Sequence, residues 1–178
     1  YTMAVLGVCT VVLASSIWIN PVAKGVPEIT KSETMQQIRD FVKEDPKAIW
    51  LVADMAYPAT NIPAMAGADC LNTTQTYPQK TRWEMLDPEG EYEDIYNRYC
   101  HIRASLGSKT MLELVSTDYV EVTLSPEDLK KLNIRYIVST NDFDEKIAAG
   151  ITNIFTDSGI EFQKYYEGTQ LSIYGCVY

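Results

Sequence analysis

The apolar run Ala48–Ala53 (AIWLVA) decides the fold class of this chain. A short continuous apolar run of this kind is typical of a β-strand that is buried on both faces. An amphipathic helix precedes it, because apolar residues recur at helical spacing from Met35 to Val42 before Asp45-Pro46 ends the pattern. A second run, Ile134–Ser139 (IRYIVS), predicts another buried strand. Helices that alternate with buried strands indicate an α/β architecture.

Turn and capping signals predict the remaining elements. A helix is expected to begin at Asp87-Pro88, to carry its apolar stripe as far as Ile102 and to end at Gly107. Shorter helices are expected from Ser125-Pro126 and around Asp144–Ala149. Four further strands are expected, of which the last two form a closing hairpin: Thr110–Val115, Tyr119–Leu124, Ile160–Tyr166 and Gln170–Val177. We therefore expect a single α/β domain over residues 30–178, with a mixed β-sheet flanked by helices.

The composition is that of an acidic globular protein. With 178 residues, of which 46% are hydrophobic and 22% charged, the chain can bury one core without disulfides or metal. Its net charge of −9 argues against nucleic acid as a partner, because nucleic-acid binding begins from a basic face. One histidine and four scattered cysteines leave little material for a metal site, so we expect no metal and no cofactor.

The first residues suggest a membrane. Residues 1–23 carry no charged side chain, and Thr2–Ile19 is mostly apolar, close to the roughly 20 residues that a membrane-spanning helix needs. We predict the end of a transmembrane helix over residues 1–20 and a linker over 21–29. A buried core helix or a strand is the alternative. Only Lys24 and Lys31 follow within a dozen residues, which weakly favours the extracytoplasmic side for the rest.

Five stretches carry a resemblance to a known class of proteins. They are NPVAKGVPEITKS (20–32), AGADCLNTTQTYP (66–78), WEMLDPEGEYEDIYNRYCHI (83–102), LKKLNIRYIVST (129–140) and FQKYYEGTQLSIYGC (162–176). Together they resemble the C-terminal extracytoplasmic domain of large bacterial multi-pass membrane proteins of the GT-C glycosyltransferase type, including YfhO-like proteins.

The resemblance implies a place and a role. The domain would lie on the extracytoplasmic side of the bacterial cell membrane, with its own transmembrane domain as a partner. Proteins of this class are thought to use a lipid-linked sugar donor, and their catalytic acidic residue belongs to a region that this chain does not include. The resemblance therefore implies an accessory domain that binds or positions a glycan or a cell-envelope acceptor, with no catalytic residue of its own.

The segment from Asn72 to His101 is the candidate contact surface. It combines several aromatic residues with amide, guanidinium and imidazole groups, which suit the apolar faces and the hydroxyls of sugar rings. The candidate ligand-binding residues are Asn72, Tyr77, Trp83, Arg98 and His101. Two alternatives stay open: the tyrosines form the inward stripe of a helix while Trp83 fills a core, or the aromatics dock a protein and bind no sugar.

Two chemical roles depend on residues in the same segment. His101 could act as a general base only with an orienting carboxylate, for which Asp87 or Asp94 is available, but no nucleophile motif is present. Cys70 and Cys100 flank the segment, and in an extracytoplasmic domain they would pair as a disulfide. That bond would close a loop of about thirty residues and stabilise the fold by about 3 kcal/mol. Two reduced, partly buried thiols are the alternative.

Overall fold

A computed structural model describes residues 2–18, 30–140 and 142–178. The chain divides into two compact units, Tyr1–Ser32 and Glu33–Tyr178. The predicted linker, residues 21–29, lies outside the described residues.

The apolar N-terminal segment forms a helix rather than a strand. Helix α1 spans Thr2–Trp18, and its described side chains are exposed. Among the described residues, no helix combines the length and the apolar character that crossing a bilayer requires. The expected transmembrane helix therefore stays a prediction.

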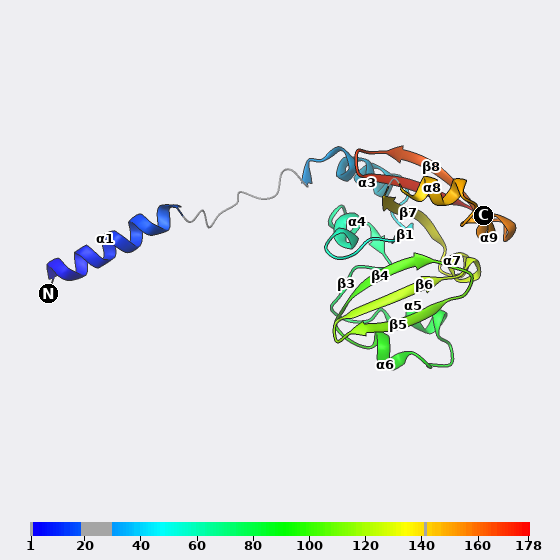
Figure 1. Cartoon of the computed structure of the whole chain (residues 1–178), viewed down its shortest axis with the longest axis horizontal. Helices are drawn as coiled ribbons and strands as arrows, with labels where there is room; N and C mark the ends of the chain where they lie inside the picture. Colours follow the sequence, from blue (N-terminus) through cyan, green and yellow to red (C-terminus); the bar gives the residue numbers. More distant parts are fainter. Residues whose placement is uncertain (1, 19–29, 141) are drawn as a thin grey trace. The chain divides into compact units, whose positions relative to one another are not determined.

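The stretch AIWLVA supplies an inner strand of a five-stranded mixed sheet. Its strand β1 (Ile49–Val52) pairs in parallel with β2 (Asp69–Cys70) and with β7 (Ile134–Thr140). The antiparallel strands β9 (Leu171–Val177) and β8 (Glu161–Glu167) complete the order β2-β1-β7-β9-β8, of which Figure 1 labels β1, β7 and β8. Trp50, Leu51 and Val52 are fully buried, which confirms that β1 is covered on both faces.

A second sheet of four strands lies beside the first. It has the order β3-β4-β6-β5, with β3 at Thr74–Gln75, β4 at Cys100–Leu106, β5 at Met111–Ser116 and β6 at Tyr119–Leu124. Strands β4 and β6 are parallel, whereas β3 and β5 pair antiparallel with their neighbours. The α/β class and the mixed pairing are thus confirmed, but the strands form two sheets instead of one.

The long helix expected from Asp87 to Gly107 is wrong. Helix α5 (Lys80–Leu86) ends just before this region, which contains the short helix α6 (Glu93–Tyr96) and then the strand β4. Cys100, Ile102 and Ala104 are buried at a spacing of two, which is the period of a strand. Asp87 is buried between the two helices, where its carboxylate accepts hydrogen bonds from the backbone N–H groups of Glu91 (2.9 Å) and Tyr92 (2.7 Å).

The other helices follow the sequence signals more closely. The first, α3 (Glu33–Glu44), buries Met35 and Ile38 as its pattern predicted. Ser125 caps α7, its hydroxyl accepting a hydrogen bond of 3.2 Å from the Asp128 N–H, as expected for a serine before proline. The remaining helices are α4 (Ile62–Met65), α8 (Asp142–Ala148), α9 (Asn153–Asp157), a 3₁₀ turn η1 (Ala59–Asn61) and α7 itself (Pro126–Lys131).

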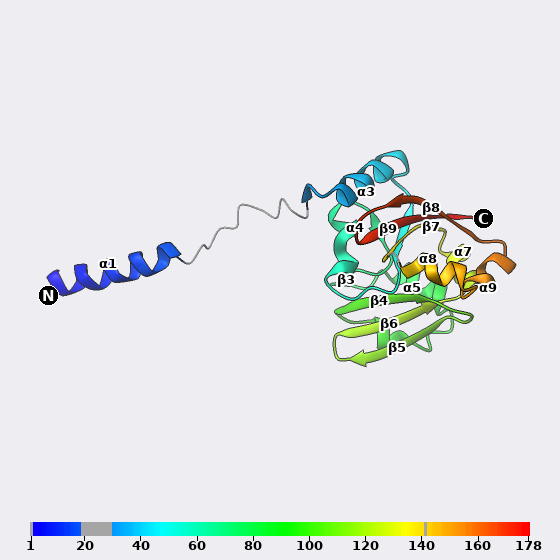
Figure 2. The same cartoon turned by 45° about the horizontal axis from the view of Figure 1, so that its top comes forward.

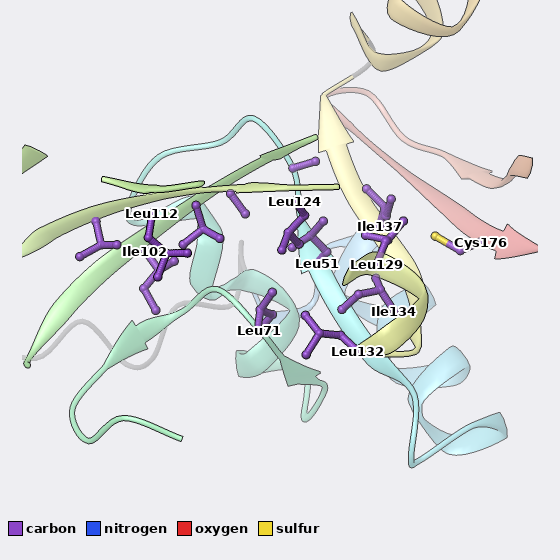
Figure 3. Packing of buried hydrophobic residues seen from close by; sticks show 14 of the residues in the cluster. Leu51, Leu71, Ile102, Leu112, Leu124, Leu129, Leu132, Ile134, Ile137 and Cys176 are labelled. Carbon is purple, nitrogen blue, oxygen red and sulfur yellow. The ribbon is translucent and has the colours of Figure 1, made fainter. Parts of the chain in front are cut away.

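Strand β1 belongs to two hydrophobic clusters at once. Leu51 and Ala53 pack in the larger cluster, together with Ile102 and Leu124 of the second sheet (Figure 3). Trp50 and Val52 point to the opposite face and pack in the smaller cluster, which Ile38 of α3 helps to form. A bridge between Ala53 and Ala104 joins the end of β1 to β4, so the two sheets are held together at this point. Figure 2 shows β7, β8 and β9 of the first sheet above β4, β5 and β6 of the second.

Candidate functional site

Asn72 holds the long loop after β1 in place. Its side-chain oxygen accepts a hydrogen bond from the Val52 N–H (2.8 Å), and its NH₂ group donates to the Val52 carbonyl (2.7 Å). The amide thus continues the pairing of β1 as a neighbouring strand would. Asn72 is 0% exposed, so its prediction as a ligand contact is wrong: a buried amide with both groups satisfied cannot reach a ligand.

A second asparagine orients a polar pair at the surface. The Asn61 side-chain oxygen accepts from the Thr74 N–H (2.9 Å), and its NH₂ group donates to the Thr74 hydroxyl (3.1 Å). The same hydroxyl lies 3.0 Å from Nδ1 of His101. The Thr74 hydroxyl already accepts a hydrogen bond from Asn61, so its own hydrogen is available to Nδ1 of His101. When Nδ1 accepts that hydrogen bond, a neutral His101 carries its proton on Nε2. In that tautomer the ring is oriented by Thr74 and directs its N–H toward the side of the Tyr99 hydroxyl, which lies 3.5 Å from Nε2.

Two tyrosines complete an aromatic cluster around this ring. The ring of Tyr57 lies 4.1 Å from that of His101 between centroids, at 34°, and Tyr99 meets His101 edge-on at 5.5 Å. Tyr57 is 52% exposed and Tyr99 is 51% exposed. We call Tyr57, Tyr99 and His101 the aromatic cluster. It offers apolar ring surface, two phenol groups and one imidazole N–H at the same place.

A pocket of about 230 Å³ adjoins β3. Thr74 belongs both to its lining and to the hydrogen bond with His101, so the pocket and the aromatic cluster are neighbours along β3. Tyr77 lines the pocket and is 83% exposed, so its ring is accessible and its role as a ligand contact stays a prediction. Arg82 also lines it, although its guanidinium is already paired with Asp69 and donates to the Cys70 carbonyl.

Trp83 is a structural residue and not a surface contact. Its side chain is 1% exposed, its ring stacks on Tyr96 with centroids 5.1 Å apart, and its Nε1–H donates to the Gln75 side-chain oxygen (2.7 Å). Gln75 in turn donates to the carbonyls of Tyr96 (2.7 Å) and Arg98 (3.0 Å). This network ties β3 to α5 and α6. The alternative in which Trp83 fills a core is therefore correct.

Arg98 also has a structural role. Its guanidinium donates to the backbone carbonyl of Asp94 and, at 3.5 Å, to that of Thr117 in the turn between β5 and β6. These contacts tie α6 to that turn. Of the five candidate contacts, the structure keeps Tyr77 and His101 at the surface, buries Asn72 and Trp83, and commits the guanidinium of Arg98 to backbone carbonyls.

The disulfide expected between Cys70 and Cys100 is not formed. Both are free buried thiols, and they belong to different hydrophobic clusters. Burial raises the pKa of Cys70 from 9.0 to about 12 and that of Cys100 from 9.0 to about 11. Both thiols are therefore protonated at neutral pH, the form that is least reactive as a nucleophile.

The arrangement around His101 also differs from that of a catalytic histidine. Its ring nitrogens contact the hydroxyls of Thr74 and Tyr99, at 3.0 and 3.5 Å. The carboxylate of Asp87, one of its two expected orienting groups, binds the backbone of Glu91 and Tyr92 instead. Among residues 2–18, 30–140 and 142–178, no cluster of three His, Cys, Asp or Glu side chains could hold a metal ion.

Two residues of the aromatic cluster were not among the five predicted contacts: Tyr57 lies outside the segment Asn72–His101, and Tyr99 lies inside it. Tyr57 lies in the long loop after β1, and loops of this length are often functional, so this is the signal that could have found it. Tyr99 was assigned to the inward stripe of a helix, and it becomes exposed because the chain enters β4 at the next residue. A strand pattern recognised at Cys100–Leu106 would have placed Tyr99 at the surface.

Comparison with known proteins yields one informative match. A family model described as "Domain of unknown function (DUF7654)" matches residues 28–178, which is most of the chain. No curated protein and no solved structure matches the chain.

Proposed function

We propose that this chain, which belongs to the DUF7654 family, is a non-catalytic accessory domain that binds a glycan or a cell-envelope saccharide acceptor. In this proposal it works on the extracytoplasmic side of a bacterial membrane, beside the transmembrane domain of a GT-C-type glycosyltransferase. The acceptor is a free or lipid-linked saccharide that the domain holds for transfer.

The observation that supports this role is the aromatic cluster. A sugar ring has an apolar C–H face, which favours flat aromatic surface, and a rim of hydroxyls, which require fixed hydrogen-bonding groups. Tyr57 and Tyr99 supply half-exposed rings, and His101 supplies an N–H oriented through Thr74. The neighbouring pocket adds the exposed ring of Tyr77, so a second sugar unit could lie along β3.

The polar groups that support the cluster are already satisfied by one another. Asn61 fixes Thr74 through two hydrogen bonds, and Thr74 fixes His101 through a third. A site that is ordered before binding loses less conformational entropy when the ligand arrives. In the alternative role, the cluster docks a protein and binds no sugar. That role predicts no response to saccharides, so the same experiment distinguishes the two roles.

The experiment is a titration of the full chain in detergent, followed by amide NMR. The probes are soluble oligomers of glucose, galactose, mannose, rhamnose and N-acetylglucosamine. We expect at least one to shift the amide signals of Thr74, His101 and their neighbours. Spectra that stay unchanged across the whole panel, from a folded protein, would contradict the proposal.

Variants then test whether the rings make the contact. Tyr57→Ala and Tyr99→Ala should each weaken binding of the active probe by about tenfold, because each removes a stacking surface. Tyr57→Phe and Tyr99→Phe keep the rings and should retain most of the affinity. Both tyrosines are half exposed, so these changes should leave the fold intact. Equal binding by the alanine variants would overturn the assignment of the cluster.

A further inference from the structure

The edges of the two sheets differ in how they are protected. An edge strand exposes unpaired backbone N–H and C=O groups, and proteins blunt such edges with short strands or charged residues. Strands β2 and β3 are two residues long, and β8 carries Glu161, Lys164 and Glu167. Lys164 is itself held by ion pairs with Asp144 and Glu167.

The edge strand β5 is less protected: it is longer than β2 and β3, carries a single charge, and has one irregularity in its pairing with β6, between Leu114 and Ser116. Its six residues are bonded on one side only, to β6. Met111 is 51% exposed and Val115 is 53% exposed, and Leu114 is exposed as well. Glu113 is the one charged residue in the strand. An apolar edge strand of this length is a template for pairing with another strand.

Glu113 indicates which charge a strand docked on β5 would carry. It lies directly opposite Glu121 of β6, and like charges in that position repel each other. The carboxylate of Glu121 is bound by Arg103 at 3.0 Å, from the side away from β5. Within the part of the chain that the structure describes, no ion pair reaches Glu113. A cation on the open side of β5 would compensate it.

We propose that β5 is a docking site for an extended peptide strand that carries a lysine or arginine opposite Glu113 and an apolar residue opposite Met111. An added strand places its residues directly opposite those of β5, with paired side chains on the same face and about 5 Å apart. The backbone groups of the edge supply the affinity, and the basic and apolar side chains supply the specificity. The net charge of −9 favours a basic partner as well.

This docking site is independent of the proposed saccharide site. The aromatic cluster reaches the second sheet through His101 on β4, whereas the docking edge is β5. Strand β6 lies between them, so a strand added to the open edge of β5 does not cover β4. Failure of one proposal leaves the other standing.

The test uses two synthetic nine-residue peptides of alternating threonine and valine, one with lysine at its central position and one with glutamate there. Binding to the full chain is measured by fluorescence anisotropy. We expect the lysine peptide to bind at least about tenfold more tightly than the glutamate peptide, because a like charge opposite Glu113 is repelled. Amide exchange in β5 should slow when the lysine peptide is bound.

A charge-reversal variant provides the decisive control. The Glu113→Lys variant should prefer the glutamate peptide. Glu161→Lys is the matched change on β8, an edge strand of the first sheet, and should leave the original preference for the lysine peptide unchanged. Glu113 and Glu161 are both exposed, so both variants should fold. Equal binding of the two peptides, binding of neither, or a preference that Glu113→Lys fails to reverse would overturn the proposal.

Discussion

Asn72 shows how one buried amide can replace a strand neighbour. Both of its hydrogen bonds go to Val52 of β1, and its side chain is fully buried. Replacing it by alanine leaves the Val52 N–H and C=O buried without partners, which should lower the free energy of unfolding by about 3 kcal/mol. Urea denaturation measures this difference. Asn97→Ala, at an exposed position, is the matched control and should change stability by less than about 0.5 kcal/mol.

The two buried tryptophans allow a second comparison of single residues. Trp83 donates its Nε1–H to Gln75, whereas Nε1 of Trp50 has no partner among the described residues. Trp83→Phe therefore breaks a buried hydrogen bond, and Trp50→Phe removes an unpaired donor. We expect Trp83→Phe to cost about 1–2 kcal/mol more than Trp50→Phe in chemical unfolding. Equal losses would show that the hydrogen bond from Trp83 to Gln75 contributes nothing to stability.

At the scale of elements, the sequence predicted those whose signal was local. The run AIWLVA, the closing hairpin and the Ser125-Pro126 helix start all lie where they were expected. The strand β4 was missed because the tyrosines before it, at helical spacing, extended a helix pattern across Cys100–Leu106. Its alternation becomes decisive only when β6 pairs beside it, a contact distant in sequence. The same error hid Tyr99, so the candidate site was predicted only in part.

The capping of α7 provides a prediction at this scale. The Ser125 hydroxyl accepts from the Asp128 N–H, while Gln79, at the equivalent position of α5, makes no side-chain cap. Ser125→Ala should lower the free energy of unfolding by about 1 kcal/mol, because one N–H of the first turn loses its acceptor. Gln79→Ala is the control and should have a much smaller effect. A loss at Ser125 no larger than at Gln79 would contradict the assignment, and thermal unfolding of both variants decides between them.

At the scale of the whole molecule, both hydrophobic clusters contain acids that burial keeps neutral. Cys70 belongs to the smaller cluster and Cys176 to the larger, and burial raises the pKa of each thiol from 9.0 to about 12. Tyr174, in the larger cluster, has its pKa raised from 10.0 to about 12, first by burial and then by its hydrogen bond to Asp144. The unfolded chain therefore releases these protons at lower pH than the folded chain does.

This difference makes the fold sensitive to alkali. Because the folded pKa lies above the unfolded one, the stabilisation is complete below about pH 9 and is lost as pH rises toward about 12. Each thiol should reduce the free energy of unfolding by about 1.4 kcal/mol per pH unit in that interval. Urea unfolding at pH 8, 9 and 10 measures the slope. Cys176→Ala should reduce this slope by the contribution of one thiol. Cys9→Ala, at an exposed cysteine, should leave the slope unchanged. A slope that is indifferent to Cys176 would show that this thiol is accessible to solvent in the folded protein, and the packing of β9 against the larger cluster would then need revision.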